Sequence, residues 1–217
     1  DYSYETPTDK PFSVTTEMSD CPWNSGNKLL SIGVKGKEIE TERVMSNIVF
    51  LLDVSGSMYS EDKLPLMAEA FCLLAENLTE NDRVSIVTYA GADEVLLKGE
   101  QGNNYRKISE VLNSLEAGGS TNGAAGINTA YELAEKYFIE GGNNRVILAT
   151  DGDLNVGVSS VSELEKLITK KRDSGVYLSV LGFGTGNLKD NKMETLADKG
   201  NGNYAYIDSI DEARKTL

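Results

Sequence analysis

The sequence contains no histidine among its 217 residues, and this absence removes several classes of chemistry. A chain without imidazole cannot use the Ser-His-Asp or Cys-His arrangements of hydrolases. It also lacks the ligand on which most catalytic zinc sites depend. Acid–base or metal chemistry in this chain therefore has to rest on other groups, above all on its 34 Asp and Glu residues.

Cysteine and long apolar runs are also scarce. The two cysteines, Cys21 and Cys72, are too few for a disulfide framework, and Cys72 falls on the apolar face of a predicted helix, which favours a buried thiol. The longest apolar run, residues 48–52, has the length of a strand and is too short to cross a bilayer. The chain begins at Asp1 with neither Met nor a signal peptide, which favours a mature or excised fragment.

Negatively charged residues outnumber positively charged ones. Lys and Arg number 21 against 34 Asp and Glu, which gives a formal net charge of −13. Because proteins bind nucleic acid largely through Lys and Arg contacts to phosphates, this balance argues against a nucleic-acid partner. It argues equally against an anionic membrane surface. An acidic surface suits the binding of a cation, although solubility alone is a sufficient explanation for it.

Two regions of the chain differ in composition. Residues 1–43 hold three of the four prolines and the only Trp, and they show little regular periodicity. We interpret them as an N-terminal accessory segment that packs on the main domain. Within this segment, residues 28–34 and 37–39 flank Gly36 and are expected to pair as a short hairpin. Residues 44–217 are expected to form one domain.

In this second region, short apolar strands alternate with amphipathic helices. The run at residues 47–53 is apolar almost throughout, as in a strand covered on both faces. Apolar residues then recur at helical spacing over residues 61–78, and a strand at 83–89 is followed by a short returning strand at 94–98. Further strands are expected at 145–150, 176–183 and 204–207, with helices between them and a last helix from 211. This alternation predicts an α/β fold with a doubly wound, Rossmann-like, mainly parallel sheet and helices on both faces.

Three polar loops stand out in this pattern. The first is Asp53-Val-Ser55-Gly-Ser57, directly after the first apolar strand; the second contains Thr121, just before a helix; the third begins at Asp151, directly after another strand. In doubly wound sheets, ligands bind beyond the carboxyl ends of the strands, where the strand order reverses. With the strand order 3-2-1-4-5-6, Asp53 and Asp151 face each other across that crevice.

The three loops offer only hard oxygen ligands, namely carboxylates and hydroxyls. Two carboxylates about 5 Å apart repel each other by roughly 3 kcal/mol at an effective dielectric constant of ~20, and a divalent cation turns this repulsion into attraction. Such oxygens suit Mg²⁺, Mn²⁺ or Ca²⁺ rather than soft metals. The competing interpretation is loop capping, in which Ser, Thr and Asp satisfy backbone N–H groups. We prefer a metal site because three separate loops agree.

The same residues resemble the metal-ion-dependent adhesion site (MIDAS) of the von Willebrand factor type A domain family, which includes the integrin I domains. That motif reads Asp-x-Ser-x-Ser, then a distant Thr and a distant Asp, and it matches Asp53, Ser55, Ser57, Thr121 and Asp151. The order of strands and helices fits the family as well. The N-terminal residues, including a Cys-Pro-Trp sequence, are most similar to YfbK-like bacterial members.

The resemblance implies a six-stranded sheet with one antiparallel edge strand. It further implies a Mg²⁺ ion held directly by Ser55, Ser57 and usually Thr121, with Asp53 and Asp151 bound partly through water. In the family, an acidic residue of a protein partner completes the metal shell. The resemblance therefore implies a metal-dependent protein-binding or adhesion module outside the cytoplasm, rather than an enzyme.

Two other functions stay open on the sequence alone. One is a scaffold or assembly domain of a larger envelope protein with no ligand of its own. The other is a Mg²⁺-dependent phosphohydrolase, since doubly wound sheets also carry such enzymes. An aspartyl phosphatase of the haloacid dehalogenase type needs a second Asp two residues after its nucleophile, and here that position is Ser55. The sequence also offers no obvious general base, which favours binding over catalysis.

Overall fold

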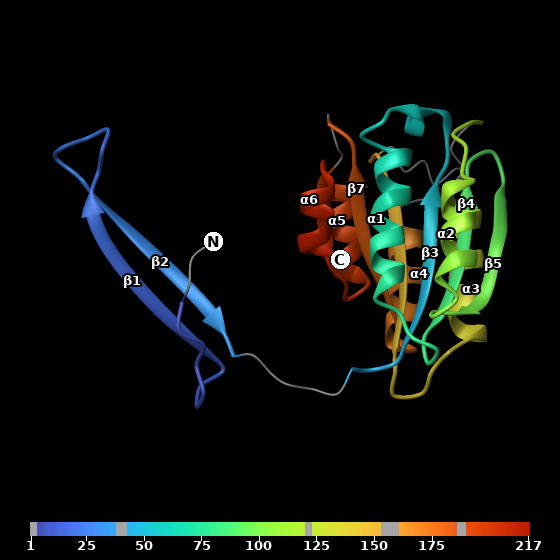
Figure 1. Cartoon of the computed structure of the whole chain (residues 1–217), viewed down its shortest axis with the longest axis horizontal. Coiled ribbons are helices and arrows are strands. Elements are labelled where there is room, and N and C mark those ends of the chain that lie inside the picture. The colour runs from blue at the N-terminus through green and yellow to red at the C-terminus, as the bar shows by residue number, and fades with distance from the viewer. Residues whose placement is uncertain (1–3, 38–42, 120–122, 153–160, 186–189) are drawn as a thin grey trace. The chain divides into compact units, whose positions relative to one another are not determined.

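The computed structural model of the chain describes residues 4–37, 43–119, 123–152, 161–185 and 190–217. Two compact units divide the chain, unit 1 at Asp1–Arg43 and unit 2 at Val44–Leu217. Figure 1 shows the strands of unit 1 and the layered sheet and helices of unit 2.

Unit 1 is built on a two-stranded antiparallel sheet. Strand β1 (Phe12–Asp20) pairs with β2 (Lys28–Gly36) along its whole length. Most of the apolar side chains fall at every second position of the two strands and so share one face. Those of one face are all more than half exposed: Phe12, Val14, Met18, Leu30, Ile32 and Val34.

The hairpin expected around Gly36 is wrong. Gly36 is the last residue of β2 and lies opposite Phe12, so the chain continues in the strand at the point where a turn was expected. The true partner of β2 is the segment from Phe12 to Asp20. A single glycine was a weak turn signal, because it fits the end of a strand equally well.

Unit 2 contains a six-stranded sheet in the order β5-β4-β3-β6-β7-β8. β5 runs antiparallel to β4 at one edge, and the other pairs are parallel. This arrangement confirms the predicted doubly wound, mainly parallel sheet with one antiparallel edge strand. The strands are β3 (Ser46–Asp53), β4 (Arg83–Tyr89), β5 (Asp93–Gln101), β6 (Asn143–Thr150), β7 (Val176–Phe183) and β8 (Tyr204–Ile207).

Helices cover both faces of this sheet (Figure 1). One face packs against α1 (Leu64–Glu76), α2 (Tyr105–Asn113) and α6 (Ile210–Thr216), the other against α3 (Gly123–Lys136), α4 (Val161–Asp173) and α5 (Asp190–Lys199). Every residue of the central strand β3 is buried, and its side chains alternate between the two cores. Phe50, for example, contacts Phe71 of α1 with ring centroids 4.5 Å apart.

The strand order reverses between β3 and β6, which are neighbours in the sheet but lie far apart in the chain. From β3 the chain moves to β4 and β5 on one side, and later returns to β6 on the other. The helices that follow β3 and β6 lie on opposite faces, so the loops after these strands diverge and leave room beyond the strand ends. Among the described residues, no helix is long and apolar enough to cross a membrane.

Candidate metal centre

Three neighbouring strands end at the same edge of the sheet and bring Asp53 and Asp151 to that edge. β3 ends at Asp53, β4 at Tyr89 and β6 at Thr150, and Asp151 follows Thr150 directly. Because β3 pairs in parallel with both neighbours, all three carboxyl ends lie side by side. The structure thus places Asp53 and Asp151 on the two sides of the point where the strand order reverses.

Asp53 is completely buried and is held by donors from three segments. Its Oδ1 accepts a hydrogen bond from the backbone N–H of Ser55 at 2.9 Å, and its Oδ2 accepts from the hydroxyls of Tyr89 at 3.2 Å and Thr150 at 3.0 Å. Burial raises the pKa of the Asp53 carboxyl above its ordinary value, the bonds from Ser55 and Thr150 oppose that rise, and the negative charge of Asp151 adds to it. A cation next to Asp53 would favour its ionised form.

Tyr89 fixes the orientation of the Asp53 carboxylate. Its side chain is completely buried, and burial, followed by the charge of Asp53, raises its pKa well above the ordinary value of tyrosine. The phenol therefore keeps its proton at neutral pH and acts as the donor in its bond to Asp53. The hydroxyl of Thr150, besides donating to Asp53, accepts from the backbone N–H of Gly152 at 3.3 Å, which ties the loop after β6 to the same carboxylate.

The two serines of the first loop present their hydroxyls together. Ser55 Oγ and Ser57 Oγ lie 3.1 Å apart, with Ser55 buried and Ser57 exposed. A short 3-10 helix, η1 (Gly56–Tyr59), begins between them and turns the chain. The arrangement brings two hydroxyl oxygens close enough to contact one ion while leaving one side open to solvent.

A neighbouring loop is fastened to the serine loop through backbone hydrogen bonds. Gly118 N–H donates to the carbonyl of Val54 at 2.8 Å, and Gly56 N–H donates to the carbonyl of Gly119 at 3.2 Å. Gly119 adopts a positive φ of 77°, which glycine accepts at little cost. Thr121, the predicted ligand two residues further on, lies outside the described residues.

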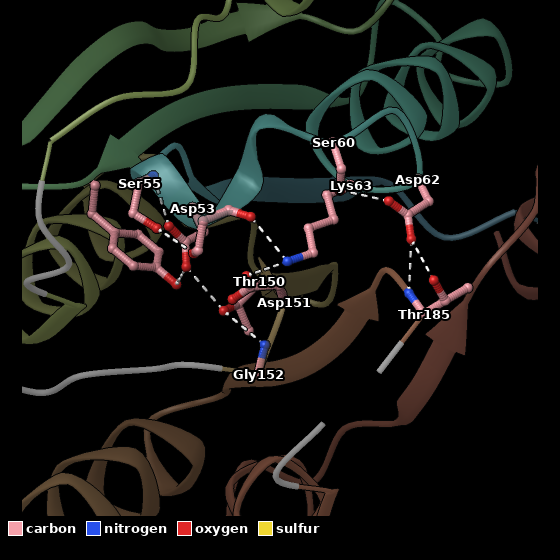
Figure 2. Close-up of polar contacts among 11 residues, drawn as sticks. Asp53, Ser55, Ser60, Asp62, Lys63, Thr150, Asp151, Gly152 and Thr185 are labelled. Atoms are coloured by element: carbon pink, nitrogen blue, oxygen red, sulfur yellow. Dashed lines mark hydrogen bonds and ion pairs between the residues drawn. The ribbon is translucent and has the colours of Figure 1, made fainter. Parts of the chain in front are cut away.

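Asp151 is engaged by a lysine from the start of α1. Lys63 Nζ lies 2.9 Å from Asp151 Oδ2 and donates to the carbonyl of Ser57, also at 2.9 Å. Figure 2 shows this lysine reaching from one loop to the other, next to the cluster around Asp53. The two halves of the site are therefore joined by a positive charge that belongs to the protein.

Comparison with known proteins identifies the family. A family model described as the von Willebrand factor type A domain matches residues 47–216. The chain belongs to this family. The uncharacterised protein YfbK of Escherichia coli (strain K12) is 45% identical over 208 residues, which cover 95% of this chain and 36% of YfbK. The chain thus spans about a third of the length of that relative.

More distant likenesses agree with the fold. Human inter-alpha-trypsin inhibitor heavy chain H3 is 30% identical over 170 residues, covering 73% of this chain and 18% of the human protein. Among solved structures, the von Willebrand factor type A protein from Catenulispora acidiphila superposes with a TM-score of 0.67 at 17% identity, covering 87% of this chain and 44% of that one. At this identity the likeness concerns the fold.

The residues of this type A domain suit a hard divalent cation. Among the described residues, no group of three or more His, Cys, Asp or Glu side chains is placed to hold a metal, so a cage built of carboxylates is absent from that part of the chain. What the site offers is two acids and two adjacent hydroxyls, all oxygen donors of the kind that Mg²⁺ and Mn²⁺ accept. Burial is the main cause of the raised pKa of Asp53 and the charge of Asp151 a smaller one, and a cation beside the carboxylate would lower that pKa.

Three residues of the site escaped the motif-based prediction. The hydroxyls of Tyr89 and Thr150 both contact the Asp53 carboxylate but lie outside the motif. Lys63 lies outside it as well. One sequence signal was available for Lys63. A lysine just before the first turn of a helix faces the positive end of the helix dipole, which is unfavourable unless an acidic group compensates for its charge.

Proposed function

We propose that residues 44–217 form a metal-ion-dependent protein-binding or adhesion module. In this proposal the ligands of a Mg²⁺ ion, or of Mn²⁺ or Ca²⁺, are Asp53, Ser55, Ser57, Thr121 and Asp151. The observation that carries the proposal is the meeting of two acids with a pair of serine hydroxyls 3.1 Å apart at the point where the strand order reverses. When bound, the ion would supply one position that a carboxylate from outside can complete.

The surroundings of the site suit contact with a macromolecule. Ser57 is exposed, and Tyr59, two residues further on, is 83% exposed. An aromatic side chain next to an exposed ligand is typical of binding surfaces, where Tyr is enriched. We therefore propose that the partner is a protein whose Glu or Asp reaches the ion while its surface packs around Tyr59.

Two further parts of the proposal rest on the family resemblance. Residues 1–43 are proposed to be an accessory segment, and the protein is proposed to act outside the cytoplasm, in the cell envelope or after secretion. Because the chain spans 36% of YfbK, the partners of a full-length protein of this kind are a matter for experiment.

Metal titration tests the proposal directly. Mg²⁺, Mn²⁺ and Ca²⁺ are titrated separately into metal-free protein by calorimetry, together with the variants Asp53→Ala and Asp173→Asn. Asp173 is an exposed acid paired with Arg172 on the surface, so its variant controls for a general loss of negative charge. We expect binding in the wild type and in Asp173→Asn, and a loss of about 100-fold or more in Asp53→Ala.

Each result of this titration has a distinct meaning. Unchanged affinity in Asp53→Ala, with a native circular dichroism spectrum, would contradict the ligand assignment. Absence of binding by every metal to the wild type would favour the scaffold alternative. Binding in the wild type that Asp53→Ala abolishes justifies a search for acidic protein partners, using the same variant as the negative control.

A further inference from the structure

The candidate metal centre contains a cation of the protein's own, and nothing in the family motif accounts for it. Lys63 Nζ forms an ion pair with Asp151 Oδ2 and a hydrogen bond with the carbonyl of Ser57, both at 2.9 Å. The pair is well shielded, since 24% of the Lys63 side chain and 6% of the Asp151 side chain are exposed. Because a partly buried ion pair is screened by salt much less than an exposed one, the charge of Lys63 acts strongly on Asp151.

The fold around Lys63 holds its side chain in this position. The backbone of Gly184, at φ +103°, lies against the lysine stem, and a Cβ added there would come within 2.9 Å of Lys63 Cε. The preceding residue, Asp62, accepts hydrogen bonds from the backbone N–H and the hydroxyl of Thr185, both at 2.8 Å. Figure 2 shows the two bonds between Asp62 and Thr185, which join the segment before α1 to the residues after β7, and the side chain of Lys63 directed toward Asp151.

The position of Lys63 is electrostatically costly for the helix that follows. α1 begins at Leu64, and the lysine stands immediately before it, where the helix dipole repels positive charge. The ion pair of Lys63 with Asp151 offsets this repulsion. An ammonium group placed here therefore acts on the carboxylate of the site.

We propose that Lys63 is a built-in counter-cation that neutralises Asp151 in the metal-free protein and lowers the affinity of the site for a divalent ion. The inference rests on the metal site proposed above. Asp53 and Asp151 carry two negative charges when ionised, and Lys63 reduces their sum to one. A divalent ion entering the site meets a weaker attraction and the repulsion of the ammonium.

The same charge has a consequence for the partner. With a divalent ion and Lys63 present, the two acids leave the site with a net charge of +1, which matches one incoming carboxylate. Lys63 thus lowers the affinity of the site for the ion in the absence of a partner. Once the ion is bound, Lys63 strengthens the attraction for an acidic residue of the partner. Metal and partner binding become coupled, each favouring the other.

Replacement of Lys63 tests this role. Lys63→Met removes the charge and keeps much of the stem, Lys63→Arg keeps the charge, and Lys171→Met serves as the matched control. Lys171 is similarly shielded, with 18% of its side chain exposed, and pairs with Glu135 at 2.6 Å away from the site. Each 217-residue chain is titrated with Mg²⁺ and with Mn²⁺ by calorimetry and melted with and without metal.

We expect Lys63→Met to bind Mg²⁺ about tenfold more tightly or better, and Lys63→Arg and Lys171→Met to stay near the wild type. Without metal, Lys63→Met should melt at a lower temperature than the wild type, because Asp151 has lost its counter-charge, and Mg²⁺ should raise its melting temperature by more than it raises that of the wild type. Should Lys63→Met fold poorly, Lys63→Gln gives the same test with a polar group of similar length.

The outcomes separate this inference from the proposed function. If the wild type binds metal and Lys63→Met binds it with equal or lower affinity, Lys63 is no competing cation and this inference is overturned while the metal site stands. If neither chain binds Mg²⁺ or Mn²⁺, the metal site itself fails, and the inference fails with it. Binding that is measurable only in Lys63→Met supports both.

Discussion

Asp82 and Asp53 are two buried acids at opposite ends of the same sheet. Asp82 lies just before β4, at the amino ends of the parallel strands, and is 1% exposed. Its carboxylate accepts hydrogen bonds from the backbone N–H of Ser46 at 2.8 Å, the N–H of Thr79 at 2.7 Å and the Thr79 hydroxyl at 2.9 Å. These donors belong to the turn before β4 and the start of β3, so Asp82 fastens two neighbouring segments.

Asp53, at the carboxyl end of β3, is equally buried and also accepts three hydrogen bonds. The difference lies in what surrounds it. A second acid, Asp151, is close enough to raise its pKa, and the hydroxyl of the buried Ser55 lies 3.1 Å from that of the exposed Ser57. Burial and hydrogen bonding alone therefore do not distinguish the two acids. What distinguishes Asp53 is the second acid beside it and the pair of serine hydroxyls in the loop that follows it.

The largest expected effect concerns the structural acid. Asp82→Ala leaves three donors without their acceptor at a buried position, and we expect it to lower the free energy of unfolding by about 3 kcal/mol. Denaturation in urea, followed by circular dichroism, measures this loss. Metal affinity should remain that of the wild type, because Asp82 lies at the other end of the sheet. A large loss of metal binding in folded Asp82→Ala would break the distinction between the two acids.

Much of unit 2 was accessible from the sequence because its signals are local. Continuous apolar runs gave the buried strands, helical spacing gave the helices, and Asp53 and Asp151 each follow a predicted strand directly. Once strands and helices alternate, few topologies remain, and the observed strand order was among them. The ligand role of these residues stays a prediction, and Thr121 lies outside the described residues.

The contacts that distinguish the two acids depend on strand register and on residues far apart in the chain. They could not be predicted from local sequence patterns. Tyr89 meets Asp53 because β4 and β3 pair without offset at that point, and a shift by one residue would turn the phenol to the other face. Lys63 meets Asp151 across 88 residues of sequence. The pairing of β1 with β2 was missed for a related reason: local turn signals do not show which of two possible partners a strand selects.

A smaller effect is expected from Tyr89→Phe. The substitution keeps the buried ring and removes one of the three donors to Asp53, so the free energy of unfolding should fall by about 1–2 kcal/mol. Tyr131→Phe is the matched control, because the buried Tyr131 hydroxyl has no hydrogen-bond partner among the described residues and its removal should be neutral or stabilising. Urea denaturation measures the free energy of unfolding of both variants. Equal losses in Tyr89→Phe and Tyr131→Phe would mean that the hydrogen bond from Tyr89 to Asp53 contributes little to stability.

The smallest effect, and the only one expected to be stabilising, concerns Asp53→Asn in the absence of metal. Burial raises the pKa of Asp53 in the folded protein, so its ionised form at neutral pH costs stability. Folding takes up a proton between the ordinary pKa of aspartate and the raised value, and the free energy of unfolding falls as the pH rises through that window. The neutral amide removes this fall, its oxygen can still accept from the Ser55 N–H, and the hydroxyls of Tyr89 and Thr150 can turn to accept from its NH2 group. We therefore expect the melting temperature near neutral pH to rise by a few degrees.

Added Mg²⁺ should make the wild type melt at a higher temperature than Asp53→Asn, the reverse of the order without metal. The ion stabilises the ionised Asp53 of the wild type and raises its melting temperature, whereas Asp53→Asn should show little response. Melting curves at several pH values, with and without Mg²⁺, test both parts. An Asp53→Asn variant that is less stable than the metal-free wild type would show that Asp53 supports the fold as Asp82 does. Asp53 and Asp82 would then differ only in the residues that surround them.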